Sequence, residues 1–202
     1  MRDVWYGDKR DLVKWGALLH IADANNAKRI LQIAYFRSLV KWDDLNLIIE
    51  GEKKAIPKSV IDHFRDIRNI EDLESRIKVL ATEFNDRKQY KQTIIDMINN
   101  GLHPCVVFLD PDTGLAPQRS RSTLKHVRDS ELRDIWNEMP VDDVLVVYQH
   151  QTNRNNLSWI PQKRSQFAKA LKLLKRSVKQ AKGPKIAKDV VLFYCRKEKE
   201  VE

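Results

Sequence analysis

The stretch Cys-Val-Val-Phe-Leu-Asp-Pro-Asp-Thr-Gly-Leu-Ala-Pro, residues 105–117, drives an apolar run directly into two carboxylates. Its first five residues are continuously apolar, which is typical of a strand buried on both faces of a helix-covered parallel sheet. Pro111 stiffens the exit of this strand, and Gly114 permits tight backbone geometry. Ligands of open α/β sheets bind beyond the carboxyl ends of the strands, so Asp110 and Asp112 are predicted catalytic residues, without a choice between them. A turn whose carboxylates bond to local amides is the alternative.

Other segments of the chain predict the sheet to which this strand belongs. Strand-like composition recurs at 29–36, 76–84, 143–150 and 189–196, and helix-like sequence separates these runs. Strands alternating with helices are typical of βαβ units. The sequence therefore predicts a single α/β domain over residues 1–202, three-layered and Rossmann-like, with a mostly parallel sheet of about five strands. Residues 39–72 show no clear strand.

The strand at 143–150 ends in polar residues, as does the strand at 105–110. Neighbouring parallel strands would bring both sets to one edge of the sheet, where His150 and the Asp pair form a plausible acid/base set. We expect the substrate-binding residues around them to be Thr113, Gln149, Gln151, Asn153 and Arg154. A structural histidine and a surface ion pair of Arg154 are the simpler interpretations.

The N-terminal segment Trp-Tyr-Gly-Asp-Lys, residues 5–9, precedes the first predicted helix. If it folds over the sheet edge, Tyr6 can stack on a base, and Asp8 and Lys9 can contact the substrate. The alternative for Asp8 is a helix N-cap.

Positive charge is concentrated at the end of the chain. The net charge is +9, and residues 151–202 hold 14 Lys and Arg against 4 Asp and Glu. Residues 161–184 open with Pro and close with Gly-Pro, which predicts one long, basic C-terminal helix. Dense Lys and Arg can neutralise phosphates, so a nucleic acid is the predicted partner, with DNA favoured over RNA. Its backbone contacts are predicted at Arg119, Arg121, Lys163, Arg164, Lys172, Lys175, Arg176 and Lys179. A merely solvated surface is the alternative, and no protein partner is inferred.

Composition excludes several classes of protein. No apolar run approaches the roughly 20 residues of a membrane-spanning helix, and no signal peptide is visible, so a cytoplasmic protein is expected. Cys105 and Cys195 are interpreted as buried thiols. No Cys and His spacing predicts a zinc site.

Two motifs resemble known families. The segment Gly-Asp-Lys-Arg-Asp-Leu-Val-Lys-Trp-Gly-Ala-Leu-Leu (7–19), followed by a strand and later by Asp-Pro after another strand, resembles the ribosomal-RNA adenine-N6 methyltransferase class. That resemblance implies a Rossmann-like fold and an Asp-Pro-Pro-Tyr motif that holds the target amine and stacks the base. Phe-Leu-Asp-Pro-Asp-Thr-Gly-Leu (108–115), together with Val-Val-Tyr-Gln-His-Gln (146–151), is similar to a group of bacterial proteins of unassigned function.

The chain departs from the methyltransferase pattern at the cofactor turn. The class needs a glycine-rich turn after its first strand to approach S-adenosylmethionine, yet no glycine lies between Gly16 and Gly51. Asp112 and Thr113 also replace the Pro-Tyr of the motif. No P-loop or dinucleotide fingerprint takes its place.

These features together favour a hydrolase that acts on nucleic acid. The leading hypothesis is excision of a base, modified or not, from a flipped nucleotide of DNA, in bacterial defence or repair. Asp110 or Asp112 would orient water or stabilise an oxocarbenium-like sugar, while His150 helps the base to depart; no cofactor is needed. The alternatives are a nuclease in which the Asp pair holds Mg²⁺, a methyltransferase with a degenerate cofactor turn, and a non-catalytic nucleic-acid binder.

Overall fold

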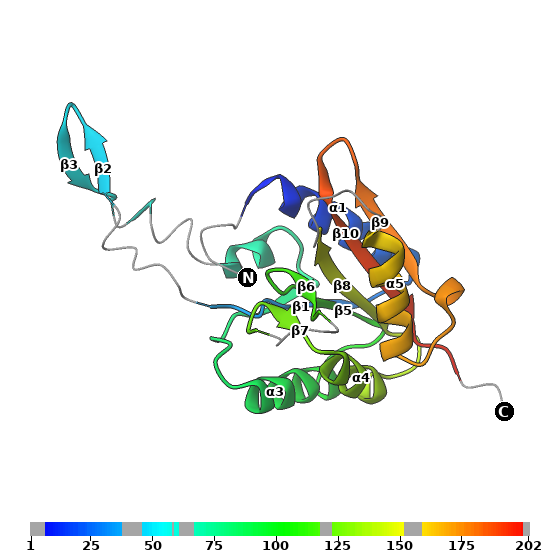
Figure 1. Ribbon diagram of the computed structural model, residues 1–202. Coiled ribbons are helices and arrows are strands. Elements are labelled where there is room, and N and C mark those ends of the chain that lie inside the picture. Colours follow the sequence, from blue (N-terminus) through cyan, green and yellow to red (C-terminus); the bar gives the residue numbers. More distant parts are fainter. Residues whose placement is uncertain are drawn as a thin grey trace.

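The computed structural model describes residues 7–37, 46–57, 59–60, 67–117, 123–151 and 159–199. Its centre is a six-stranded sheet in the order β4-β1-β5-β8-β10-β9 (Figure 1). The first four strands of this order are parallel, and the last two run antiparallel to their neighbours. Their bounds are β1 Arg29–Ile33, β4 Ile77–Leu80, β5 Cys105–Leu109, β8 Val144–His150, β9 Lys179–Gly183 and β10 Ala187–Arg196. The predicted α/β class with a mostly parallel sheet is therefore confirmed.

Helices cover both faces of the sheet (Figure 1). Helix α1 (Lys9–Ala24) covers one face, and α3 (Arg87–Asn99), α4 (Asp129–Glu138) and α5 (Trp159–Ala170) cover the other. Side chains of a strand alternate between faces, and β5 shows this directly. Phe108 packs in the core under α1, whereas Val107 packs in the core under the three other helices. Because both faces of β5 are buried, its sequence is continuously apolar rather than alternating.

The prediction of one long C-terminal helix over residues 161–184 is wrong beyond residue 170, where α5 ends. Helix α5 ends in a Schellman motif: Leu173 N–H donates to the Ala168 carbonyl at 2.9 Å, and Lys172 N–H to the Lys169 carbonyl at 3.2 Å. Lys172 takes the left-handed position of this motif with φ 58°. A short 3₁₀ turn, η4 (Lys175–Ser177), then leads into β9, which pairs with β10. Pairing with a distant strand overrides the helical spacing of this segment and adds the sixth strand to the sheet.

A hairpin lies within residues 39–72, where no strand was predicted. Strands β2 (Asn46–Ile49) and β3 (Glu52–Ala55) pair with each other, and Figure 1 draws them apart from the main sheet. The turn residues Glu50 and Gly51 have φ 53° and 84°, which is the type I′ geometry of a two-residue hairpin. The strand pattern was hidden because the apolar side chains of β2 do not face a core: Ile48 is 65% exposed.

The described part of the chain also holds three smaller elements. They are the 3₁₀ turn η3 (Ile67–Asp72) and the short parallel pair β6 (Gly114–Leu115) and β7 (His126–Val127). Cys105 and Cys195 are free and buried, as predicted. Within the part of the chain that the structure describes, no helix has the length and apolarity needed to cross a membrane.

Candidate active site

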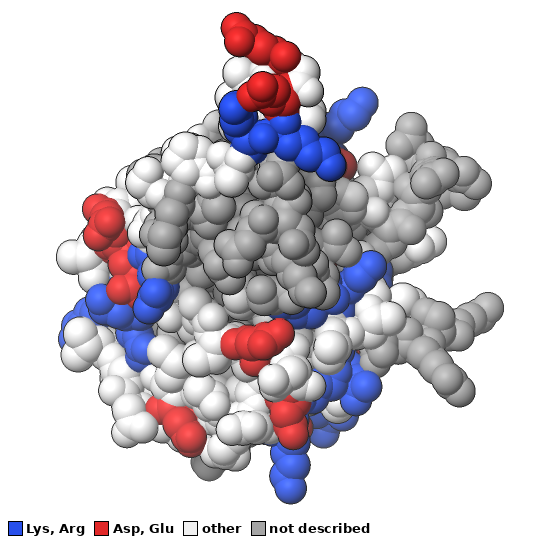
Figure 2. All heavy atoms as spheres, turned by 90° about the vertical axis from the view of Figure 1, so that its left-hand side faces the viewer, with Lys and Arg blue, Asp and Glu red and all other residues white. Residues whose placement is uncertain are grey.

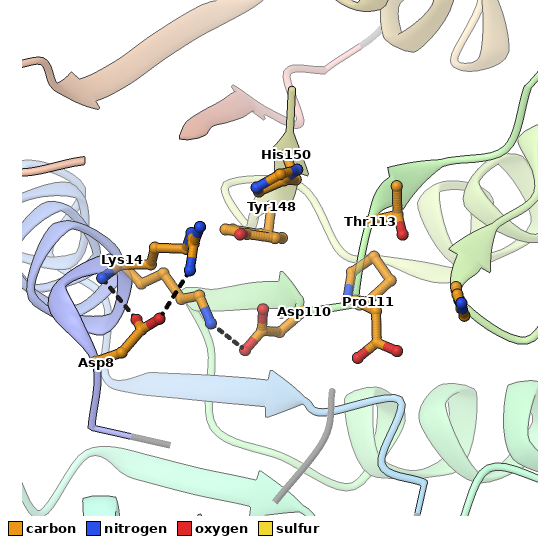
Figure 3. Close-up of a pocket in the computed structure, with 10 residues that line it drawn as sticks. Asp8, Lys14, Asp110, Pro111, Thr113, Tyr148 and His150 are labelled. Atoms are coloured by element: carbon orange, nitrogen blue, oxygen red, sulfur yellow. Dashed lines mark hydrogen bonds and ion pairs between the residues drawn. The ribbon is translucent and has the colours of Figure 1, made fainter. Parts of the chain in front are cut away.

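A cleft of about 280 Å³ lies where the carboxyl ends of β5 and β8 meet the first turns of α1 (Figure 3). Pairing of Leu109 with Val147 aligns the two strands, so their polar extensions emerge side by side. Segments far apart in the sequence thus meet at one edge of the sheet. The lining residues are Asp8, Arg10, Lys14, Asp110, Pro111, Asp112, Thr113, Lys125, Tyr148 and His150.

Asp110 belongs to a buried ion network. It is 1% exposed, and its Oδ2 accepts hydrogen bonds from Lys14 Nζ at 3.1 Å and Gln32 Nε2 at 3.0 Å. Lys14 Nζ also lies 2.8 Å from Asp11 Oδ1 and 4.7 Å from the ring centroid of Tyr148. Burial raises the pKa of Asp110, and the charge of Lys14 opposes that shift. Burial alone would lower the pKa of Lys14, but the two carboxylates outweigh it and raise the pKa, so Lys14 carries its charge.

Asp112 is the more accessible carboxylate of the pair. Its side chain is 13% exposed and forms an ion pair with Arg37. Partial burial by itself would raise the pKa of Asp112, but nearby positive charge, including that of Arg37, more than offsets this and lowers the pKa. Asp112 therefore presents an ionised carboxylate to the cleft.

His150 is oriented through both of its ring nitrogens. Nε2 lies 3.0 Å from Asp189 Oδ2 on β10, and Nδ1 lies 3.0 Å from the carbonyl oxygen of Gln151. Both partners are acceptors, so only the doubly protonated ring satisfies both contacts. The ring is a third exposed, and it reaches the cleft from the end of β8 (Figure 3).

Arg10 links His150 to the start of α1. Its Nη2 lies 2.6 Å from Asp189 Oδ2, and its Nη1 lies 3.0 Å from Asp8 Oδ2. Partial burial by itself would raise the pKa of Asp189. The hydrogen bonds that Arg10 donates outweigh this effect, so the pKa of Asp189 is lowered. Asp8, Arg10, Asp189 and His150 thus form one chain of charged contacts along the cleft.

Gln149, predicted to bind substrate, is instead a buried structural residue. Its Oε1 accepts from Leu115 N at 2.9 Å, and its Nε2 donates to the Thr113 carbonyl at 3.0 Å. Gly114 makes room for this amide: it has φ +114°, and a Cβ atom there would lie 2.4 Å from Gln149 Oε1. The amide therefore pins the Asp-Pro-Asp-Thr-Gly loop to β8 and is unavailable to a ligand.

The other residues predicted to contact substrate differ in where they lie. Asp8 caps α1, accepting from Arg10 N at 2.7 Å and Asp11 N at 3.3 Å, and it also lines the cleft. Thr113 lines the cleft as well. Lys9 is exposed and outside the lining, and Gln151 contributes its carbonyl oxygen to His150. Five predicted contacts, Tyr6, Arg119, Arg121, Asn153 and Arg154, lie outside the described residues.

One of the predicted phosphate contacts is wrong. Lys163 is buried, where its Nζ donates to the Leu115 carbonyl at 2.9 Å and to Gln166 Oε1 at 3.0 Å. Burial lowers its pKa. Arg164 is half-buried and donates to the Val178 carbonyl, directly before β9. Both side chains hold α5 to neighbouring backbone, and Lys163 is not part of a cationic surface.

The remaining predicted contacts are exposed but lie away from the cleft. His150 at the cleft pairs with Val190, whereas Lys179 pairs with Tyr194, which pairs with Val146 further towards the amino end of β8. Lys172, Lys175 and Arg176 precede β9 and are exposed. On the face in Figure 2, the described Lys and Arg side chains form separate groups with acidic side chains between them. Among the described residues, Lys125 is an exposed cation that lines the cleft.

Several cleft residues were not predicted. Lys14 and Arg10 line the cleft, and Gln32 and Asp189 hold cleft residues in place. Lys14 had a visible signal, because it shares a helical face with Leu18 and a charge on an apolar stripe needs a partner. Asp189 had none, since only the antiparallel return of β10 brings it to His150.

Two features of the site weigh against Mg²⁺ and S-adenosylmethionine. Both carboxylates of the Asp pair already face a cation, Lys14 or Arg37, which competes with a metal ion. Within the described ranges, no group of three or more His, Cys, Asp or Glu could hold a metal. The exit of β1 is formed by buried Ala34 and Tyr35, which do not offer the close backbone approach of a glycine turn.

Comparison of the sequence with protein-family models gives no match, and comparison with curated proteins gives no significant match. The resemblance to the methyltransferase class stays a prediction that depends on its two motifs.

Proposed function

We propose that this cleft is the active site of a hydrolase acting on nucleic acid, and that its reaction is the removal of a base. The observation that carries the proposal is the convergence of Asp112, held ionised, and His150, held by two acceptors, on one cleft. Such a pair supplies a carboxylate for developing positive charge and an acid for a leaving group.

The strand order supports a ligand site at this place. Along the chain, β4 is added on one side of β1, and β5 and β8 are added on the other. The order therefore reverses between β1 and β5, as at the switch point of doubly wound, Rossmann-like sheets, where ligands bind beyond the strand ends. Asp110 and Asp112 follow β5 at this point.

The size of the cleft suits one nucleoside. Pockets for small ligands begin at about 300 Å³, close to the 280 Å³ found here and too small for stacked base pairs. A nucleotide would therefore enter only when rotated out of its helix. Lys125, exposed at the rim, is positioned to contact a flanking phosphate.

Base excision would divide the work between the two residues. His150 donates a proton to the departing base as the bond between the base and the sugar breaks. Asp112 stabilises the positive charge that forms on the sugar. Water then supplies a hydroxyl group to the sugar carbon and returns a proton to His150. Asp110, buried against Lys14, positions the loop and does not reach the substrate.

The experiment uses purified protein with end-labelled DNA and RNA, including DNA with modified bases. Each reaction is split between alkali and no alkali, with and without EDTA. Breaks that appear only after alkali and resist EDTA are expected. Direct breaks that EDTA abolishes would indicate a metal-dependent nuclease instead.

A methyltransferase is the second candidate, because the switch point and the Asp110-Pro111 pair coincide there with the resemblance noted above. The missing glycine turn after β1 speaks against this candidate. Titration calorimetry with S-adenosylmethionine separates the two candidates, and we expect no heat of binding.

A further inference from the structure

A second hollow of about 620 Å³ lies between α1 and β9, and it shares no lining residue with the cleft. Its lining includes residues along the length of α1 but not Lys14. The lining residues are Leu12, Val13, Gly16, Ala17, His20, Ile21, Ala24 and Asn25 of α1 and its end, Lys179–Gly183 of β9, and Ile186 and Tyr194. It is called the α1–β9 groove below.

The groove runs along the edge of the sheet. Strand β9 is the last in the strand order, and no described strand pairs with its outer side. All five residues of β9 line the groove, although side chains of a strand alternate between its faces. Tyr194 of β10 also lines the hollow, which therefore lies over the α1-facing side of β9 and β10, beside the outer edge of β9. Such an edge offers backbone donors and acceptors to an added strand.

The floor and flanks of the groove are apolar. Val13, Ile21 and Ala181 line it, and Leu12 and Ile186 beside it are 68% and 48% exposed. Strand addition needs this combination, because main-chain bonds give affinity while apolar pockets accept alternate side chains.

The charge of the groove selects among occupants. Lys179, Lys182 and His20 belong to the lining, which contains no Asp or Glu. A second copy pairing through β9 would bring Lys179 and Lys182 of the two strands together, and like charges opposite each other are destabilising. A nucleic acid would leave the apolar floor uncovered and the strand edge unpaired.

We propose that the α1–β9 groove binds an extended segment of a partner protein, in which apolar residues alternate with Asp or Glu, as an added strand on β9. Apolar residues of the segment face α1, and its carboxylates, on the opposite face of the added strand, pair with Lys182. This surface is separate from the cleft, so the inference stands whether or not the proposed activity is found.

The test begins with a displayed library of random 12-residue peptides selected on the full chain. A Lys179→Glu/Lys182→Glu variant, checked for an unchanged melting temperature, serves for counter-selection. A Lys175→Glu/Arg176→Glu variant has the same charge change outside the groove and is the matched control. Enriched peptides are measured by fluorescence anisotropy and by hydrogen exchange of the β9 amides.

We expect enriched peptides that alternate apolar and acidic residues and protect β9 amides from exchange. They should bind the Lys179→Glu/Lys182→Glu variant about tenfold more weakly and the control variant as the wild type. Methylating alternate backbone nitrogens of the peptide should abolish binding. Enrichment of basic peptides, or of none that distinguishes the two variants, would overturn the proposal. Displacement by duplex DNA would assign the groove to nucleic acid, and dimerisation lost in the groove variant would assign it to a second copy.

Discussion

His150 on β8 and Asp189 on β10 lie 3.0 Å apart, from Nε2 to Oδ2, across two antiparallel strands. Arg10 binds the same oxygen at 2.6 Å. The carboxylate thus fixes the ring of the proposed acid from a strand that contributes no residue to the cleft lining, and Asp189 is a positioning residue.

Replacing Asp189 with Asn keeps the shape of this contact and removes the charge. If Asp189 positions His150, kcat for base release should fall about a hundredfold while KM stays close to that of the wild type. The pH profile of the variant should also change on its alkaline limb, where the acid loses its proton. Lys188→Gln, a neighbouring exposed position, is the control, and an unchanged profile in Asp189→Asn would leave Asp189 a purely structural role.

Arg10→Gln should destabilise the fold at pH 7 but much less at pH 3. The pKa of Asp189 is lowered in the folded protein, so its ion pair stabilises the fold above about pH 4 and loses that effect as pH falls through the folded pKa. The variant should lose about 0.5–1 kcal/mol at pH 7, since both partners are about a quarter exposed. Urea unfolding at pH 7 and pH 3 checks this, and a loss of the same size at both values would contradict it.

Lys14→Met should be among the most destabilising changes at the cleft. It leaves Asp110 buried without its cation, which costs about 3–5 kcal/mol at neutral pH. Without Lys14 the pKa of Asp110 rises further above its unfolded value, so the loss should grow as pH rises through that window and shrink in acid.

The double variant Lys14→Met/Asp110→Asn is the control for this network. Removing both charges should cost less than the sum of the two single changes. Additive losses in urea unfolding would show that the two groups are not coupled.

Gly114→Ala should destabilise the Asp-Pro-Asp-Thr-Gly loop by about 1–3 kcal/mol, because of its positive φ and its contact with Gln149. Gly16→Ala is the matched control, because nothing lies within 4 Å of a Cβ atom there and the position is helical. That control should be neutral or stabilise by up to about 1 kcal/mol. Equal melting temperatures for the two variants would contradict the close approach.

Lys125→Gln tests whether nucleic acid passes over the rim of the cleft. Removing one phosphate contact should weaken binding and lower the slope of log K against log salt by about 1, whatever the sequence. Lys88→Gln, exposed on α3, should leave the slope unchanged. The same slope for wild type and Lys125→Gln would remove Lys125 from the interface.

The sequence predicted strands best where the apolar pattern of a segment matches its burial in the folded protein. Apolar runs predicted β5 and β8 because those strands are buried on both faces, and the polar residues after them predicted the cleft edge. The same reasoning failed after residue 170, because Lys172 occupies a helix-ending position where glycine is usual and gives no signal. Lys163 shows a further limit: a lysine on a basic-looking helix is hidden by contacts to Leu115 that only the tertiary structure creates.

The most direct test is mass spectrometry of free bases released from a panel of unmodified and modified DNA, in EDTA, by wild type and Asp112→Asn. Asp96→Asn, exposed on α3, is the control, and DNA binding is followed in parallel by anisotropy. We predict base release by wild type and control, and release at least about a hundredfold slower by Asp112→Asn with binding retained. Release by Asp112→Asn at the wild-type rate, or no base released from any member of the panel, would contradict the account.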